Sequence, residues 1–222
     1  MDKKKNYLQL KKFCSDLGVD LFGVADISAI KKDFMLSPKL LEKFDQAICL
    51  GVRLSGGILE EISDAPTRLY FHHYRAVNTF LDQAAIKVYS YIQRKGYLAL
   101  PIPASQILDW QNQKAHLPHK KLGVLAGLGW IGRSNLLVNK NLGSQFRLVS
   151  VLTNIPLKLD LPLEKDCGDC MLCVKACPAG AIKEEPLKFD HGKCFEKLQS
   201  FQKQRLVDQY ICGVCVKACK GN

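Results

Sequence analysis

The sequence predicts an α+β protein in two parts: a mixed α/β front domain over residues 1–160 and a small cluster-binding module over residues 161–222. Three observations support this. Helix-like and strand-like segments alternate along the first part, which indicates helices layered on a sheet. Eight of the ten cysteines fall between residues 167 and 219. The segment from Pro156 to Pro162 links the two patterns, and 222 residues leave room for one medium domain and one small module.

The front domain shows three helical patterns. Apolar residues at three- and four-residue spacing over residues 5–17 predict an amphipathic helix that stops at Gly18. The same spacing predicts a long helix over residues 66–95, ended by Gly96, and residues 119–126 predict a short one. Strands are expected in the short apolar runs 21–25, 47–52, 97–100, 134–138 and 146–152.

The cysteines follow a spacing that is written twice. The first run, C-x₂-C-x₂-C-x₃-C-P from Cys167 to Pro178, is the bacterial ferredoxin pattern that holds [4Fe–4S] clusters. Further on, Cys212-Gly-Val-Cys215-Val-Lys-Ala-Cys219 repeats Cys170-Met-Leu-Cys173-Val-Lys-Ala-Cys177. A complete second run would need cysteine at position 209, where the chain has Gln209, and the upstream Cys194 can take that place.

In two-cluster modules the fourth cysteine of each run binds the other cluster. The spacing therefore predicts two [4Fe–4S] clusters and an electron-transfer role. One cluster takes Cys167, Cys170, Cys173 and Cys219. The other takes Cys194, Cys212, Cys215 and Cys177.

Zinc binding and disulfide bonding fit the cysteine pattern less well. Zinc sites use paired C-x₂-C motifs without this continuous run. A disulfide framework requires export, and no apolar segment follows the initial lysines as in a secretory signal. No run approaches the ~18 apolar residues of a membrane span, so we expect a cytoplasmic protein with no membrane contact. Cys14 and Cys49 lie in apolar segments and are expected to be small buried residues.

The net charge of +11 belongs mainly to the front domain, because residues 1–165 carry a balance of +9 and residues 166–222 one of +2. Such charge suits an anionic substrate, a phosphate-bearing cofactor, RNA or an acidic electron donor. Much of it lies in scattered lysine pairs, which are typical of a solvated surface. No aromatic-rich RNA motif accompanies it.

A glycine-rich turn precedes the cysteine module. Gly127, Gly129 and Gly132 formally complete G-x-G-x-x-G, but the dinucleotide fingerprint needs a strand before it and a helix after it. Here the order is reversed, and no acidic residue follows before Asp160. Nicotinamide binding is therefore rejected. Two interpretations stay open: a backbone that approaches a flat cofactor, or a tight helix-to-strand turn with a buried Trp130.

Several short motifs, taken in order, resemble epoxyqueuosine reductase, a family related to the corrinoid reductive dehalogenases. They are Ala126-Gly-Leu-Gly-Trp-Ile-Gly132, Leu136-Leu137, Gly143-Ser144, Leu152-Thr153, Cys-Gly-x-Cys and Cys-Pro-Ala-x-Ala-Ile182. The resemblance runs from about residue 66 to the end. It implies a front domain related to the flavin nitroreductases that holds base-off cobalamin against the ferredoxin-like module. The clusters then pass electrons to the cobalt.

The same resemblance implies a set of corrinoid-contacting residues: Gly127, Gly129, Trp130, Ile131, Arg133, Asn135, Leu152 and Thr153. Arg133 suits a corrinoid amide or phosphate, and a surface salt bridge would account for it equally well.

The chain departs from the family pattern in two respects. Epoxyqueuosine reductases place an acidic proton donor in an Asp-Ser-x-Pro stretch before the turn, whereas residues 112–116 here read Asn-Gln-Lys-Ala-His, with Asp109 slightly upstream. Full-length members also continue into a helical-repeat domain that holds tRNA, and this sequence stops three residues after Cys219. We therefore expect a short paralogue for which tRNA is not the substrate.

Three residues are candidates for proton transfer near the cofactor. His119 begins the helix that leads into the turn, Tyr74 lies on the apolar face of the long helix, and Asp109 is the nearest carboxylate. Histidine titrates near neutrality and suits this role. His72 and His116 are expected to face solvent.

The sequence thus predicts a cobalamin-dependent, iron–sulfur reductase-like enzyme. A low-potential ferredoxin or flavodoxin would supply electrons, and a small molecule or a corrinoid protein would accept them. The alternative is an electron carrier or activase that reduces a partner corrinoid or flavin enzyme. A front domain that binds FMN is possible and is not favoured.

Overall fold

The computed structural model describes residues 2–110, 112–185 and 188–221. The chain forms two compact units, each assembled from separate segments. Unit 1 comprises Met1–Val52, Asn78–Leu128 and Arg147–Leu163, and unit 2 comprises Arg53–Val77, Gly129–Phe146 and Glu164–Asn222. The border predicted between residues 160 and 161 is linear, whereas two internal segments group with the cysteine-rich end. So short a module buries little apolar surface by itself, which gives a physical reason for these additions.

Unit 1 is built on a four-stranded sheet in the order β1-β2-β6-β3. Its strands are β1 (Leu21–Asp26), β2 (Gln46–Arg53), β3 (Ala99–Ile102) and β6 (Phe146–Thr153). The pairs β1–β2 and β3–β6 are antiparallel. Residues 47–51 of β2 and 149–153 of β6 are buried continuously, which indicates that both faces of the sheet are covered. All four strands were predicted from the sequence, within a few residues.

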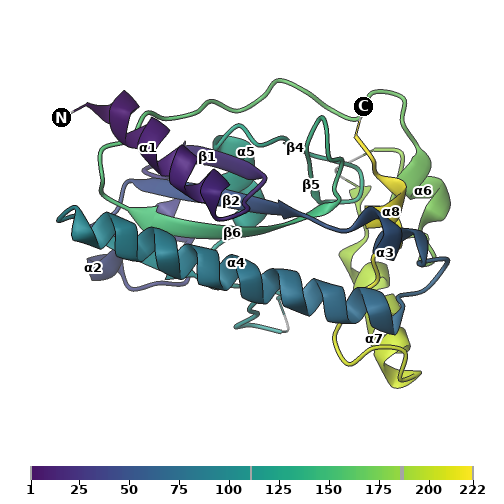
Figure 1. Ribbon diagram of the computed structural model, residues 1–222. Helices are drawn as coiled ribbons and strands as arrows, with labels where there is room; N and C mark the ends of the chain where they lie inside the picture. Colours follow the sequence, from purple (N-terminus) through teal and green to yellow (C-terminus); the bar gives the residue numbers. More distant parts are fainter. Residues whose placement is uncertain (1, 111, 186–187, 222) are drawn as a thin grey trace. The chain divides into compact units, whose positions relative to one another are not determined.

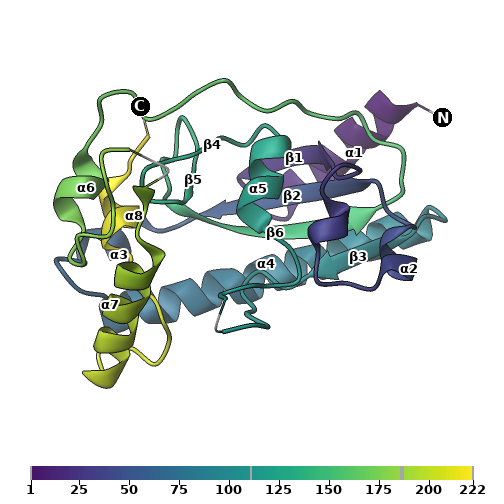
Figure 2. The ribbon, with the colours of Figure 1, turned by 180° about the vertical axis from the view of Figure 1, so that it is seen from behind.

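Helices cover the two faces of this sheet. The helices α1 (Lys3–Asp16) and α4 (Arg68–Arg94) lie on one face, and α5 (His119–Leu125) lies on the other (Figures 1 and 2). A Cβ added at Gly23 of β1 would come within 2.2 Å of the Ala126 carbonyl oxygen. Only glycine therefore lets the end of α5 lie this close to the strand. The three predicted helices are confirmed, and short helical turns at Lys31–Asp33 and Pro38–Leu41 were not foreseen.

Asp160 fastens the extended segment that leaves the sheet. Its carboxylate accepts hydrogen bonds from the Tyr7 hydroxyl at 2.9 Å and from the amide of Val24 at 3.0 Å. Its own amide donates to the Val24 carbonyl oxygen at 2.9 Å. Burial, followed by the hydrogen bond and the negative charge of Asp160, raises the pKa of Tyr7, so Tyr7 stays the donor. One carboxylate thus joins α1, β1 and the 154–163 segment.

Unit 2 surrounds the eight cysteines with short elements. They are α3 (Gly56–Glu60), the hairpin β4 (Trp130–Ile131) and β5 (Leu137–Val138), α6 (Leu172–Ala176), α7 (His191–Lys203) and α8 (Val214–Ala218). The strand predicted over residues 134–138 is thus reduced to two residues of a hairpin. The first turn of α7 is capped by Asp190, whose carboxylate accepts from the Lys193 amide at 2.9 Å.

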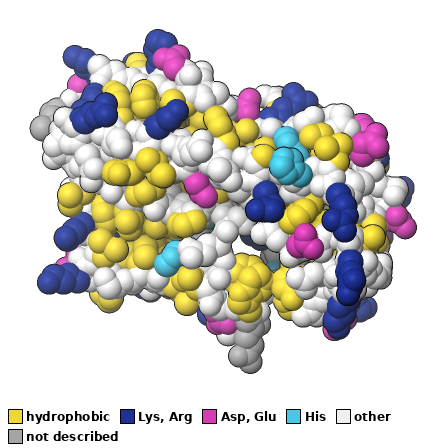
Figure 3. Space-filling model, turned by 60° about the horizontal axis from the view of Figure 1, so that its bottom comes forward, with side chains coloured by type: hydrophobic (Ala, Val, Ile, Leu, Met, Phe, Trp, Pro, Cys, Tyr) yellow, Lys and Arg dark blue, Asp and Glu magenta, His cyan; other side chains and the backbone are white. Residues whose placement is uncertain are grey.

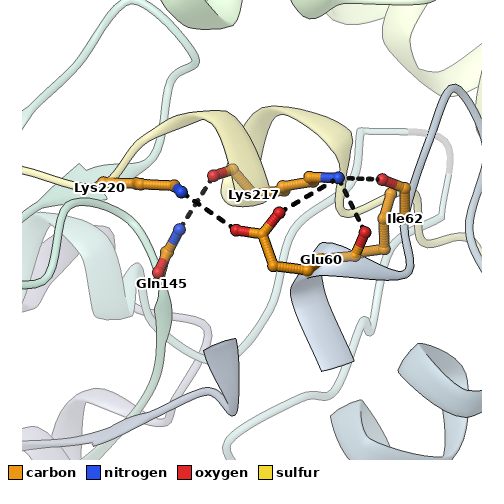
Figure 4. Close-up of polar contacts among 5 residues, drawn as sticks. All are labelled: Glu60, Ile62, Gln145, Lys217 and Lys220. Carbon is orange, nitrogen blue, oxygen red and sulfur yellow. Dashed lines mark hydrogen bonds and ion pairs between the residues drawn. The ribbon is translucent and has the colours of Figure 1, made fainter. Parts of the chain in front are cut away.

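A partly buried lysine joins α3 to α8 within unit 2 (Figure 4). The Lys217 ammonium donates to the carbonyl oxygens of Glu60 and Ile62 at 2.9 and 2.7 Å, and its own carbonyl accepts from Gln145 at 2.9 Å. Lys220 donates to the Glu60 carboxylate at 3.0 Å, and this bond lowers the pKa of Glu60. The residue that corresponds to Lys217 in the first repeat, Lys175, is exposed. The lysines in the two copies of Val-Lys-Ala-Cys therefore differ in role: Lys217 binds backbone carbonyl oxygens near α3, and Lys175 lies on the surface.

The surface charge is spread out. On the face drawn in Figure 3, lysine and arginine side chains stand in small separate groups, and hydrophobic side chains lie between them. None of the helices in the described parts of the chain combines the length and the apolar character that a membrane crossing needs.

We expect Tyr7→Phe to lower the free energy of unfolding by about 1.5 kcal/mol, because the Asp160 carboxylate loses a charged hydrogen bond in a partly buried place. Urea denaturation measures this. Tyr89→Phe is the matched control, since among the described residues the Tyr89 hydroxyl has no hydrogen-bond partner. Equal losses in the two variants would contradict the role of Asp160.

Candidate cluster-binding site

The cysteines of unit 2 stand on short helices and the loops before them. Cys173 lies in α6 and Cys215 in α8, and each of these helices is followed by the last cysteine of its run, Cys177 or Cys219. A backbone hydrogen bond from the Cys170 amide to the Cys167 carbonyl closes the first loop at 3.1 Å. The two runs therefore present their thiols in similar local settings.

The thiols fall into two groups, as their mutual electrostatic effects show. Burial raises the pKa of Cys173 to about 11, and the negative charges of Cys219, Cys167 and Cys170 add to this rise. We call these four residues the first cysteine group. The described residues thus bring together the fourth cysteine of the second run and the first three of the first run.

The second cysteine group comprises Cys177, Cys194, Cys212 and Cys215. Burial raises the pKa of Cys212 to about 11, with further increases from Cys194 and Cys177. Burial also raises the pKa of Cys215, helped by its three partners and by Cys173 of the first group. The influence of Cys173 on Cys215 places the two groups next to each other.

This donor set suits iron–sulfur clusters chemically. No three His, Cys, Asp or Glu side chains within residues 2–110, 112–185 and 188–221 lie close enough to hold a single metal ion. A tetrahedral zinc ion draws its four ligands to about 2.3 Å from one centre, whereas the thiolates of a [4Fe–4S] cluster bind four different iron atoms. Burial raises the pKa of Cys173, Cys212, Cys215 and Cys219, which favours their protonated thiols, so cluster binding at these residues releases protons.

Two glycines allow the chain to pack tightly around the cysteines. Gly143 has φ +58°, and a Cβ there would lie 1.9 Å from the carbonyl oxygen of Cys219. Gly213 has φ +85°, and its Cβ would lie 2.6 Å from the ring of Tyr70 and 2.8 Å from Ile62. Both positions need glycine for conformation and for space. The first brings the 139–146 segment onto Cys219, and the second brings α4 onto the second run.

The three glycines of the turn contact protein atoms of their own unit. A Cβ at Gly127 would lie 2.7 Å from the Leu161 carbonyl oxygen, and one at Gly129 would lie 1.9 Å from that of Val138. At Gly132 it would meet Val138 at 2.7 Å and the sulfur of Cys167 at 3.1 Å. Packing within the chain therefore accounts for all three. The turn between α5 and β4 is the helix-to-strand turn that one interpretation predicted, with Trp130 only 5% exposed.

The remaining predicted residues of the turn are held by their neighbours. Arg133 donates to the carbonyl oxygens of Glu184 at 2.6 Å and Gly168 at 2.9 Å, so its guanidinium fastens the cysteine loops. Asn135 has φ +56° and contacts His191 at 3.3 Å. Ile131 is 39% exposed and is the most accessible member of this group.

Leu152 and Thr153 lie inside unit 1. Both are fully buried in β6. The Thr153 hydroxyl donates to the Leu98 carbonyl oxygen at 2.8 Å and accepts from the Ile155 amide at 3.1 Å. Both side chains are therefore engaged within unit 1, and their contact with a corrinoid stays a prediction.

The candidates for proton transfer occur in both units. Asp109 and His119 belong to unit 1 and Tyr74 belongs to unit 2. The Asp109 carboxylate accepts from the amide of Asn112 at 3.0 Å and from its side chain at 2.8 Å, which links these two residues. Tyr74 is half-buried and lies beside Tyr70, with ring centroids 6.4 Å apart.

His119 is engaged at both ring nitrogens. Its Nε2 lies 2.9 Å from the carbonyl oxygen of Pro103, which can only accept, so Nε2 carries the proton. Its Nδ1 lies 2.9 Å from Ser150 Oγ and accepts from that hydroxyl. Burial lowers the pKa of His119 to about 4, so the imidazole is neutral at physiological pH. These contacts tie the start of α5 to β6.

The support that unit 2 receives from residues 53–77 was not foreseen from the sequence. Tyr70 and Ile62 contact Gly213, and Glu60 binds Lys217 and Lys220. One local signal was the glycine in Cys212-Gly-Val-Cys215, where the first repeat has Met171. A glycine at that place indicates a close neighbour and does not identify it.

Comparisons with known proteins agree with this geometry. Residues 166–222 match the family model described as a 4Fe-4S double cluster binding domain. Over 245 aligned residues the chain is 28% identical to the epoxyqueuosine reductase of Cyclobacterium marinum, covering 96% of this chain and 78% of that protein.

The chain is similar to the epoxyqueuosine reductases. The resemblance expected from the sequence is thereby confirmed.

Two solved structures share the fold. One is a reductive dehalogenase described in connection with B12-dependent dehalogenation, with a TM-score of 0.79 and 20% identity over 98% of this chain. The other is the epoxyqueuosine reductase from Streptococcus thermophilus, with a TM-score of 0.63 and 19% identity over 96% of this chain. This chain covers 32% and 65% of those two chains. A relationship of the front domain to the nitroreductases stays a prediction.

The low pKa of His119 predicts acid sensitivity. In the unfolded chain His119 becomes protonated below about pH 6.5, whereas in the folded chain it becomes protonated only near pH 4. The free energy of unfolding therefore falls as the pH is lowered from 6.5 to 4. We expect a loss of about 2 kcal/mol between pH 7.5 and pH 5, measured by denaturant unfolding, because the difference of one proton acts over about 1.5 pH units at about 1.4 kcal/mol per unit. His119→Gln should lose correspondingly less over the same interval, and the same pH dependence in both proteins would contradict the assignment.

The contact of Gly143 with Cys219 predicts that Gly143→Ala loses one cluster. The added methyl cannot fit 1.9 Å from the Cys219 carbonyl oxygen, and φ is unfavourable for alanine. Iron analysis of anaerobically prepared protein should fall from about eight atoms per chain toward about four. Gly57→Ala is the control, because a Cβ at Gly57 meets nothing within 4 Å. Full iron content in Gly143→Ala would refute the packing argument.

Proposed function

We propose that this protein is an iron–sulfur oxidoreductase that passes electrons through two [4Fe–4S] clusters to a bound acceptor, and that this acceptor is base-off cobalamin. The observation that carries the first part is the arrangement of the eight cysteines in two groups of four. The family model for residues 166–222 supports it independently. We assign the first cysteine group to one cluster and the second cysteine group to the other.

The path of electrons is inferred from the neighbours of each group. Cys173 of the first group contributes to the raised pKa of Cys215 in the second group, so the groups are neighbours and an electron can pass between the two clusters. The glycine turn lies against Cys167 of the first group through Gly132. The first group is therefore the one beside the turn, and we propose that its cluster delivers electrons to the acceptor. A low-potential ferredoxin or flavodoxin is the expected donor.

The proposal of cobalamin has support that is separate from the cysteines. The epoxyqueuosine reductase of Cyclobacterium marinum aligns with most of this chain, and the reductive dehalogenase that shares its fold is described in connection with B12. When bound and reduced, cobalamin supplies a low-valent metal with strong reducing power. The side chains expected around it are largely bonded within the chain, which leaves the exposed Ile131 as the most accessible of the predicted contacts.

Protein purified without oxygen, and loaded with iron and sulfide, tests this proposal. We expect added cobalamin to change its visible spectrum on binding, and we expect reduction of the clusters to be followed by reduction of cobalt. Cys167→Ala should keep the cluster of the second group and lose cobalt reduction. Cys14→Ala, which changes a buried thiol of unit 1, should behave as the parent protein.

The outcomes separate the parts of the proposal. Failure to bind cobalamin would refute the cobalamin part. If, in addition, the reduced protein passed electrons to a separate corrinoid or flavin protein, the electron-carrier alternative would replace it. An iron content far below about eight atoms per chain after reconstitution would refute the two-cluster assignment itself.

A further inference from the structure

Ser144 places an unpartnered hydroxyl beside the first cysteine group. Its side chain is only 3% exposed, and its Oγ has no hydrogen-bond partner among the described residues. Its amide donates to the carbonyl oxygen of Cys219 at 3.2 Å, directly after the close contact of Gly143 with the same carbonyl. A buried hydroxyl without a partner is costly, and in folded proteins such groups are uncommon away from functional sites.

The backbone bond between Ser144 and Cys219 brings this hydroxyl close to a proposed cluster ligand. Burial raises the pKa of Cys219, and the Ser144 hydroxyl opposes this effect, together with the amide groups of Ser144 and Gly221. The geometry is separate from this effect: the Ser144 hydroxyl is buried next to the Cys219 backbone and has no hydrogen-bond partner among the described residues. A thiolate is a much better acceptor than a thiol. Cluster ligation, which requires the thiolate, would complete the bond.

We propose that Ser144 tunes the reduction potential of the cluster held by the first cysteine group, by donating a hydrogen bond from its Oγ to the sulfur of Cys219. This inference rests on the two-cluster assignment of the proposed function and is independent of cobalamin. Ser144 acts through Cys219 and is a positioning residue.

The direction of the effect follows from charge. One electron passes from the second cluster to the first, and no bond is formed or broken. The added electron increases the negative charge on the cluster and its sulfurs, so a donor to sulfur stabilises the reduced state more than the oxidised state. Ser144 therefore raises this potential and favours the electron on the cluster beside the Gly132 turn.

The test is a redox titration of the full chain, with both clusters loaded, followed by electron paramagnetic resonance. In Ser144→Ala we expect one of the two midpoint potentials to fall and the other to stay. At a fixed potential, the reduced-to-oxidised ratio should drop about threefold, which equals about 28 mV at 59 mV per tenfold change. Ser150→Ala, a buried serine of unit 1, is the matched control and should leave both potentials unchanged.

If Ser144→Ala binds its clusters poorly, a second pair of variants tests the same hydrogen bond. Ser144→Thr keeps the hydroxyl and Ser144→Val replaces it with a methyl group of nearly the same shape. We expect the parent potential in the first and the lowered potential in the second. Resonance Raman bands of the iron–cysteine stretches should shift in D₂O for the parent and for Ser144→Thr, and less for Ser144→Val.

Unchanged potentials in Ser144→Ala and Ser144→Val, with about eight iron atoms bound, would overturn this inference and leave the proposed function intact. Equal shifts of both potentials would overturn it as well, because the effect would not belong to Cys219. Loss of cobalamin binding in the parent protein would refute the cobalamin proposal while the change in potential still supported Ser144.

Discussion

The close contact between the 139–146 segment and the end of the second cysteine run underlies the whole of unit 2. Gly143 lies against the carbonyl of Cys219, and Ser144 donates its amide to the same atom. Cys219 belongs to the second cysteine run but completes the first cysteine group. This contact therefore holds Cys219 where it can join the first three cysteines of the first run. Gln145 extends it by donating to the carbonyl of Lys217. A segment far from the cysteines in sequence therefore holds Cys219 in the first cysteine group.

The cysteine-rich end does not supply this support itself. Its helices α6 and α8 contain only five residues each, which is too short to be stable in isolation. Contacts with other segments of unit 2 stabilise these short helices. The Lys217 ammonium donates hydrogen bonds to the backbone carbonyl oxygens of Glu60 and Ile62 near α3. The side chains of Tyr70 and Ile62 pack against Gly213. Arg133 adds two more bonds to carbonyl oxygens of the cysteine loops. Most of these contacts are hydrogen bonds to backbone carbonyl oxygens, so they stabilise the backbone conformation of the loops.

Unit 1 follows a similar principle with different chemistry. Asp160 joins three segments through one carboxylate, and His119 joins α5 to β6 through two neutral hydrogen bonds. The role considered for His119 from sequence was proton transfer. With a pKa of about 4 and both nitrogens engaged, the ring is a structural connection at neutral pH. A histidine beside a motif is therefore weak evidence for catalysis until its partners are known.

The sequence by itself determined the elements whose pattern is local. The periodicity of α1 and α4, the apolar runs of the sheet strands and the doubled cysteine spacing each lie within one short stretch, so their geometry is encoded there. The spacing alone also grouped Cys219 with the first run. Only the tertiary structure decided which distant segments support the cysteines, because a glycine such as Gly143 or Gly213 reports that something lies close without saying what. It likewise showed that the Gly127–Gly132 turn packs on its own chain and that the Ser144 amide binds the carbonyl oxygen of Cys219. Those contacts join residues tens of positions apart, and they depend on how the backbone closes around them.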